Sequence, residues 1–306
     1  MNKLEIKQID TKSLGAQFLL LVTTFFWGIT FAIVKEAVEQ VGVFLFLSQR
    51  FILAFAILLA ICLLSRRKFK PAALKHGIIL GSLLFGGYAF QTLALVYTTA
   101  SNTAFLTGLN VVFVPLIGGL MFGHLITMHM KWGVLVAAVG MFFLCTAQGL
   151  KLNVGDFLGG ICAVCVAFHI IYTGRYARHN DIYWLTAIQI GTVALLSVII
   201  ALLQGDRIVV WHPEILWPLI ICVFFATIFA FLVQTSMQRF TSPTHTALIF
   251  CMEPVFAALF AYVTIDERLG LKGLAGAILI FGGMLLSQVS MPDKLYQKQT
   301  GEEQFL

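Results

Sequence analysis

The chain of 306 residues is 59% hydrophobic and only 11% charged, and its mean hydropathy is +0.93. A water-soluble domain of this size carries more charge on its surface, so the composition excludes that class and indicates an integral membrane protein. The formal net charge of +6 is spread over short loops rather than gathered in one basic domain, which argues against a nucleic-acid partner.

Ten apolar runs follow one another along the chain, each close to the roughly 20 residues that cross a bilayer as a helix. The first run is too long for a cleavable signal peptide and is interpreted as a membrane span. The expected fold class is therefore an all-α polytopic membrane protein with ten transmembrane helices. The spans are expected at residues 15–34, 42–64, 74–97, 100–121, 132–149, 156–174, 183–203, 215–237, 244–265 and 270–289.

Most of the 20 Lys and Arg residues fall on one side of these spans, the side that both termini share. Cytoplasmic loops carry the excess of basic residues, so residues 1–14 and 290–306 are expected to form two cytoplasmic tails. The expected location is the cell membrane, which the chain crosses many times.

The two halves of the chain resemble one another. One shift aligns Gln91 with Gln234 and Gly140 with Gly283, and a slightly smaller shift aligns the first two runs of each half. Residues 15–149 and 150–289 are therefore interpreted as two repeats of five spans. Because five is odd, the second repeat is inverted in the membrane, an arrangement typical of secondary transporters that hold a solute between the halves.

Three stretches resemble the EamA-type drug/metabolite transporter family. They are Phe26-Trp27-Gly28, the sequence ASNTAFLTGL at 100–109, and LIFCMEPVFAAL at 248–259, preceded by Thr241-Ser242-Pro243. The resemblance extends from about residue 15 to 289. It implies alternating access between two five-helix bundles and, in many members, export of amino acids or related metabolites. One departure is that the family often has the pair Glu267-Arg268 in both halves, whereas the first half here has His124 and Leu125.

Two charged residues, Glu253 and Arg50, fall well inside expected spans. A charge at the bilayer centre costs roughly 2.5 to 3.5 kcal/mol, so each needs a partner or a cavity. Glu253 precedes Pro254, which is expected to kink the helix because it lacks an N–H group. Glu253 is interpreted as a group that contacts solute or couples transport to protons, or as a hydrogen-bonded link between helices. Arg50 is interpreted as a counter-ion to Glu253 or to a solute carboxylate, or as a side chain that reaches the interface.

Other polar and aromatic residues in the spans are candidates for lining a solute cavity. Asn110 is the repeat equivalent of Glu253, and His169 is the group best suited to titrate near neutral pH. Each candidate also has a structural interpretation, as packing or as hydrogen bonding between helices. Gly86 and Gly87 are candidate hinges. The cavity candidates are Trp27, Tyr88, Gln91, Thr107, Asn110, His169, Tyr172, Gln234 and Phe250.

The sequence lacks a GxxxxGK[ST] phosphate loop, which argues against transport driven by ATP, and it lacks HExxH and GxSxG motifs. Cys162 and Cys165 form an isolated CxxC in an apolar run, so no metal or other cofactor is expected. The expected function is secondary transport of a small-molecule solute across the lipid bilayer, with a homodimer left open. A structural or regulatory membrane subunit is one alternative. An intramembrane enzyme is another, although it would need clustered ligands or a nucleophile with its base.

Overall fold

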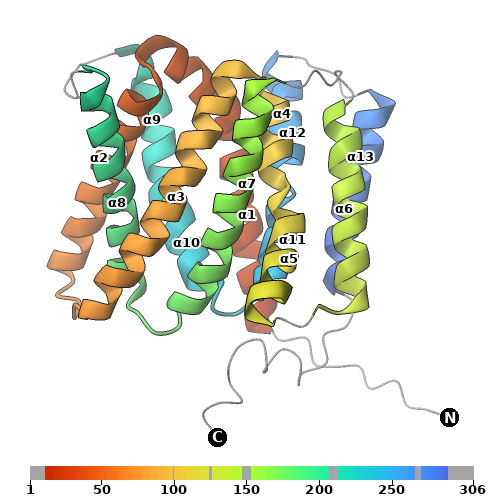
Figure 1. Cartoon of the computed structure of the whole chain (residues 1–306), viewed down its shortest axis with the longest axis horizontal. Coiled ribbons are helices and arrows are strands. Elements are labelled where there is room, and N and C mark those ends of the chain that lie inside the picture. The colour runs from red at the N-terminus through yellow and green to blue at the C-terminus, as the bar shows by residue number, and fades with distance from the viewer. Residues whose placement is uncertain are drawn as a thin grey trace, which may run out of the picture.

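A computed structural model describes residues 11–98, 100–123, 126–146, 153–206, 213–265 and 270–288. The regular structure in these ranges is helical, and the helices run side by side in one bundle (Figure 1). Eight helices are long and apolar enough to cross a membrane, and two shorter apolar helices accompany them at Met128–Phe143 and Leu271–Ser287. The all-α polytopic fold with ten spans is therefore confirmed.

The first five spans are α1 (Thr11–Val41), α2 (Val43–Leu64), α3 (Pro71–Tyr97), the broken pair α4 (Ala100–Gly108) and α5 (Asn110–Phe122), and α6 (Met128–Thr146). The sixth and seventh are α7 (Val154–Tyr176) and α8 (Ile182–Leu203). The eighth combines the 3-10 turn η1 (Pro213–Ile215), α9 (Leu216–Val223), the π-helix η2 (Phe224–Phe229) and α10 (Ala230–Met237). The last two are the broken pair α11 (Pro243–Phe250) and α12 (Glu253–Ile265), and α13 (Leu271–Gln288).

Polar residues and prolines fix where several spans begin. Asn153 and Asp156 form a capping box at the start of α7, and the Asp181 carboxylate accepts hydrogen bonds from two backbone N–H groups at the start of α8. Ser242 caps α11, whose first residue is Pro243. Such residues satisfy backbone groups that lack partners at a helix terminus, so these boundaries are encoded locally.

Two spans break at equivalent points of the two halves. α4 ends at Gly108 and α5 begins at Asn110, while α11 ends at Phe250 and α12 begins at Glu253. Pro254 cannot donate the hydrogen bond that would continue the helix through the second break. The Cys251 Sγ lies 4.0 Å from the Gly108 carbonyl oxygen, and these residues are 143 positions apart. The two breaks therefore lie in contact with one another.

Glycines let the last span of each half pack backbone to backbone. A Cβ atom at Gly133 would lie 2.7 Å from the Gly283 carbonyl oxygen, and one at Gly140 would lie 2.7 Å from the Gly276 carbonyl oxygen. α6 and α13 lie side by side in Figure 1. Contact at this distance requires glycine, as in other close helix pairs of membrane proteins.

We expect the variant Gly283→Ala to lower the thermal unfolding midpoint of the protein in detergent. Its Cβ would lie 2.6 Å from the Gly133 carbonyl oxygen and 2.8 Å from the Ala137 nitrogen, so the two helices would have to separate. Gly282→Ala is the matched control, because a Cβ there meets no atom within 4 Å. The control should gain about 0.5 kcal/mol from better helix propensity. Equal midpoints for the two variants would contradict the close contact.

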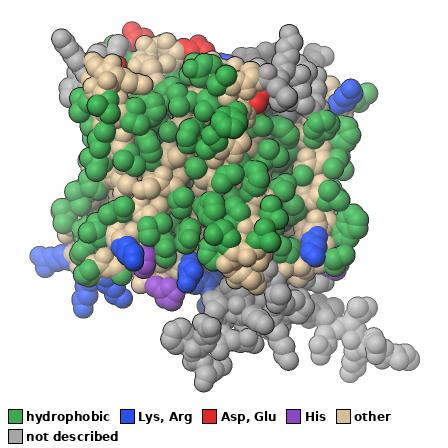
Figure 2. Space-filling model, viewed as in Figure 1, with side chains coloured by type: hydrophobic (Ala, Val, Ile, Leu, Met, Phe, Trp, Pro, Cys, Tyr) green, Lys and Arg blue, Asp and Glu red, His purple; other side chains and the backbone are tan. Residues whose placement is uncertain are grey.

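Charged side chains separate to the two ends of the bundle. In Figure 2, most of the Lys and Arg side chains lie along the lower edge, although blue atoms are also visible at the upper right. Asp and Glu lie along the upper edge, and hydrophobic side chains cover the flank between them. This distribution is the one that the positive-inside rule predicts when the lower edge faces the cytoplasm. The orientation of the chain stays a prediction.

Candidate functional site

A cavity with about 730 Å³ of empty space lies among spans of both halves. The first half contributes residues from α1, α2, α3, α4 and α5, and the second half contributes residues from α7, α10, α11 and α12. Of the predicted cavity candidates, eight line it together with Arg50, Glu253 and Gly87: Trp27, Tyr88, Gln91, Thr107, Asn110, His169, Gln234 and Phe250. That space includes the open mouth of the cavity.

Three of the singled-out residues lie elsewhere. Tyr172 is half-buried and stacks on Tyr176, with ring centroids 5.5 Å apart, rather than lining the cavity. Gly86 packs against α7, because a Cβ there would lie 2.9 Å from the Cys165 Sγ. Pro254 follows Glu253 in the first turn of α12 and shapes the break rather than the cavity wall.

Arg50 is 2% exposed and is held in the cavity wall by partners from α3 and η2. Its Nε donates to the Thr227 hydroxyl at 2.8 Å, and its Nη2 donates to the Tyr88 hydroxyl and the Ala226 carbonyl, both at 3.2 Å. The guanidinium also lies over the Tyr88 ring, 4.8 Å from its centroid. Arg50 therefore stays in the membrane interior as a fixed positive charge instead of reaching the interface.

The π-helix η2 supplies two of these partners. A π-helix shifts the backbone hydrogen bonds by one residue, which frees a carbonyl group and is common at functional sites. The Ala226 carbonyl accepts from the Trp27 indole N–H at 2.9 Å as well as from Arg50. The Thr227 hydroxyl donates to the Cys222 carbonyl at 2.7 Å, so its oxygen is left to accept the hydrogen bond from Arg50. The local unwinding thus positions both a wall residue and the buried cation.

Glu253 lies at the start of α12 and is 7% exposed. Its carboxylate accepts no hydrogen bond from any residue that the structure describes, and no Arg50 nitrogen lies within 4.0 Å of it. A direct ion pair between these two residues, one of the expected interpretations of Arg50, is therefore not formed within the described ranges. A buried carboxylate without a partner costs several kcal/mol, which is typical of a functional group rather than of a link between helices.

Gly28 brings α1 close to the break at Glu253. A Cβ at Gly28 would lie 2.7 Å from the Glu253 carbonyl oxygen and 2.7 Å from the Phe256 Cβ. Only glycine allows this approach. In the Phe-Trp-Gly stretch of α1, Trp27 lines the cavity, and Gly28 lets α1 approach the backbone at Glu253.

Aromatic rings form much of the wall around these charges. The Trp27 ring makes an edge contact with Phe250, with centroids 5.0 Å apart, and a tilted contact with Phe231 at 5.5 Å. Phe231 also meets Tyr88 edge-on at 6.1 Å. These rings are apolar and present π faces, so the cavity can accommodate an apolar or cationic part of a solute.

Polar side chains at the cavity are oriented by partners behind them. His169 Nε2 lies 2.9 Å from Gln189 Oε1, and the Gln189 amide donates to the Thr235 hydroxyl at 3.3 Å. These contacts hold the imidazole ring of His169 in place at the cavity wall. On the opposite side, the Gln91 amide donates to the Thr107 hydroxyl at 3.3 Å.

Several lining residues were not predicted: Thr30, Phe31, Val34, Leu84, Thr92, Leu95, Val166 and Phe231. Most are apolar, and an apolar residue in a membrane span carries no signal that separates a cavity wall from a lipid-facing surface. Phe231 precedes Gln234 by about one helical turn, and this spacing is the one feature that could have indicated it. No group of three or more His, Cys, Asp or Glu residues suited to a metal occurs in the part of the chain that the structure describes.

Comparisons with known proteins agree with this architecture. The profile of the EamA-like transporter family matches the chain twice, over residues 14–146 and 153–288. An uncharacterized transporter of Archaeoglobus fulgidus is 32% identical over 275 residues, which cover 90% of this chain and 86% of that protein.

More distant relatives also match most of the chain. The uncharacterized transporter YoaV of Bacillus subtilis is 21% identical over 277 residues, covering 88% of this chain and 94% of that protein. A protein crystal structure with 20% identity has the same fold, with a TM-score of 0.72 over 90% of this chain and 97% of that one. Two matches to one family profile, over nearly the whole sequence, identify this chain as a member of the EamA-like transporter family.

Proposed function

We propose that this protein is a secondary transporter that exports small metabolites, among them amino acids or related compounds, by alternating access. The solute is held between the repeats 15–149 and 150–289. The observation that carries the proposal is the central cavity, in which a buried carboxylate has no hydrogen-bond donor among the described residues and a buried cation lines the same space.

The charges in the cavity suit a dipolar solute. A guanidinium carries five N–H donors, and only Nε and Nη2 of Arg50 serve the protein contacts described above, so donors remain for a solute carboxylate. Glu253 offers a negative charge from the other repeat. A solute with one charge of each sign satisfies both groups without leaving a net charge in the membrane, which supports amino acids or related compounds.

The conformation described supports access from the side opposite the termini. Lining residues such as Val34 and Leu95 lie in the half of α1 and of α3 that is farthest from the cytoplasmic tails. Towards the tails, the Gln234 amide donates to Gln238 at 3.1 Å, and the Gln238 amide donates to the Ile170 carbonyl at 3.2 Å. These hydrogen bonds connect α10 to α7 on the cytoplasmic side of the cavity. Breaking them would let the two helices separate and expose the solute to the cytoplasm.

The proposal places the protein in the cell membrane with both tails in the cytoplasm, as the charge distribution supports. Rocking of the two repeats then alternates access, and Gly86, Gly87 and the break before Pro254 are the proposed sites of bending.

Flux into proteoliposomes tests the proposal. We expect the full-length protein to accelerate uptake of neutral amino acids above the rate in protein-free liposomes, and a proton gradient to accelerate it further, because Glu253 can carry a proton through the membrane interior. Uptake of radiolabelled amino acids is measured with and without the gradient. If no amino acid or related metabolite moves faster than in protein-free liposomes, a structural or regulatory role is favoured instead.

A further inference from the structure

One end of the cavity offers hydrogen-bond acceptors that no described residue uses. The side-chain oxygens Oδ1 of Asn110 and Oε1 of Gln234 have no hydrogen-bond partner, although each residue is only 1% exposed. Both residues line the cavity together with Glu253. Buried polar atoms nearly always have partners, so unpaired acceptors around one cavity point to a ligand.

The orientation of both amides is fixed by groups that can only accept. The Asn110 Nδ2 donates to the Thr107 carbonyl at 2.8 Å. The Gln238 amide donates to the Ile170 carbonyl at 3.2 Å, which turns its oxygen towards the Gln234 Nε2 at 3.1 Å. A carbonyl cannot donate, so neither amide can be reversed without losing a bond. The oxygens of Asn110 and Gln234 are therefore left as the free groups.

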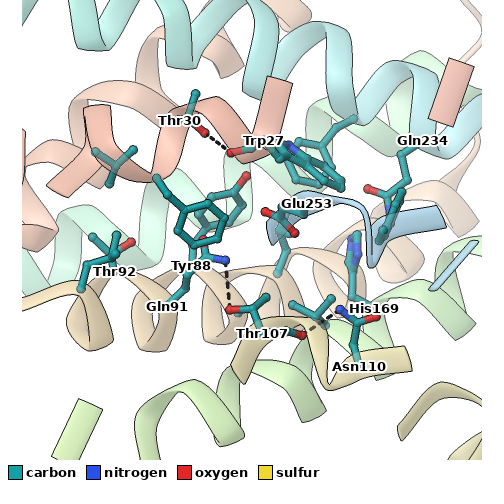
Figure 3. Close-up of a pocket in the computed structure, with 18 of the residues that line it drawn as sticks. Trp27, Thr30, Tyr88, Gln91, Thr92, Thr107, Asn110, His169, Gln234 and Glu253 are labelled. Atoms are coloured by element: carbon teal, nitrogen blue, oxygen red, sulfur yellow. Dashed lines mark hydrogen bonds between the residues drawn. The ribbon is translucent and has the colours of Figure 1, made fainter. Parts of the chain in front are cut away.

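Several hydrogen-bond donors at the cavity wall are already used by acceptors of the protein. The Trp27 indole N–H bonds to the Ala226 carbonyl, and Arg50 is held by Thr227, Tyr88 and the same carbonyl. In the view of Figure 3, the labelled Asn110 and Gln234 lie on one side of Glu253. The side chains of these three residues thus present acceptors, one of them a carboxylate.

We infer that Glu253, Asn110 and Gln234 form a subsite for a primary ammonium group. Such a group carries one positive charge and three N–H donors, which match one carboxylate and two amide oxygens. The rings of Trp27 and Phe250 add π faces for the cation and apolar surface for its carbon chain. A quaternary ammonium group carries the same charge without an N–H donor and leaves these acceptors unpaired. The inference rests on the proposed function, which takes this cavity as the solute site.

Thermal unfolding of the purified full-length protein tests the subsite with a matched pair of probes. n-Butylammonium chloride and n-butyltrimethylammonium chloride have the same charge and chain, and they are compared at equal ionic strength. A ligand that binds the folded state raises the unfolding midpoint, and the rise grows with the logarithm of its concentration above Kd. We expect such a rise with n-butylammonium and none with its trimethyl form. Equal rises with both compounds, or no rise with either, would overturn the inference.

Substitutions of Gln234 test whether n-butylammonium binds at the proposed subsite. Gln234→Leu is expected to weaken binding of n-butylammonium about tenfold, because a charge-assisted hydrogen bond is lost. Gln204→Leu is the matched control, since Gln204 is exposed at the end of α8 and should leave binding unchanged. Gln234→Glu keeps a hydrogen-bond acceptor and is expected to keep the preference for n-butylammonium over its trimethyl form. This variant provides a test if Gln234→Leu does not fold. Unchanged binding in Gln234→Leu would remove Gln234 from the subsite.

The results separate the subsite from the transport proposal. Selective stabilisation by n-butylammonium without flux in proteoliposomes supports the subsite and contradicts transport. Flux of amino acids without any preference between the two probes supports transport and contradicts the subsite.

Discussion

Replacing Glu253 by glutamine is expected to slow amino-acid flux about 100-fold, which corresponds to roughly 3 kcal/mol and is the scale of losing one charge of a buried pair. Glutamine has the same shape but neither a negative charge nor a proton to exchange. Because no described residue donates a hydrogen bond to the Glu253 carboxylate, the substitution breaks no protein contact there, and the variant should fold. Initial rates in proteoliposomes, normalised to the amount of reconstituted protein, measure the loss.

Glu39→Gln is the matched control for this experiment. Glu39 is exposed near the end of α1, outside the cavity, so the same chemical change there should leave the rate unchanged. A Glu253→Gln variant that transports at the rate of the unaltered protein would show that Glu253 links helices and takes no part in solute binding or coupling. A variant that folds but binds without transporting would assign Glu253 to the coupling step.

The ten spans could be predicted because hydrophobic length is a direct physical requirement of the bilayer. The predicted ends of the spans were less accurate next to charged residues. The first span was expected to end at residue 34, yet α1 continues to Val41. Lys35 lies within this extension and donates to the Thr98 carbonyl at 3.2 Å. Of the two central breaks, Pro254 marks the second, whereas the break at Leu109 has no proline and follows only from the symmetry of the halves.

The polar part of the cavity could be predicted because polar side chains inside membrane spans are costly and therefore conspicuous. The hydrogen-bond partners of these side chains could not be predicted. The contacts of Arg50 depend on a π-helix at Phe224–Phe229, and the apolar sequence of that segment does not predict a π-helix. Tyr172 lies one turn after His169 and about 60° further around α7. Its ring contacts Phe122, at 5.7 Å between centroids, and does not line the cavity.

Arg50→Met is expected to change which solutes the protein accepts. If Arg50 binds the solute carboxylate, its loss should weaken leucine binding about 100-fold, because a hydrogen bond between two charged groups is worth up to roughly 3 kcal/mol. Binding of 3-methylbutylamine, which is leucine without its carboxylate, should change much less. Isothermal titration of the purified protein with both compounds measures the two affinities.

The structure indicates that Arg50→Met can fold. The Ala226 carbonyl keeps its bond from the Trp27 indole at 2.9 Å, and the Thr227 hydroxyl keeps its bond to the Cys222 carbonyl at 2.7 Å, so neither buried group is left without a partner. Lys75→Met, at an exposed position near the start of α3, removes the same charge outside the cavity and is the control. If Arg50→Met binds leucine and the amine as the unaltered protein does, Arg50 only ties α2 to η2. If it loses both compounds equally while staying folded, Arg50 shapes the whole cavity and does not select the carboxylate.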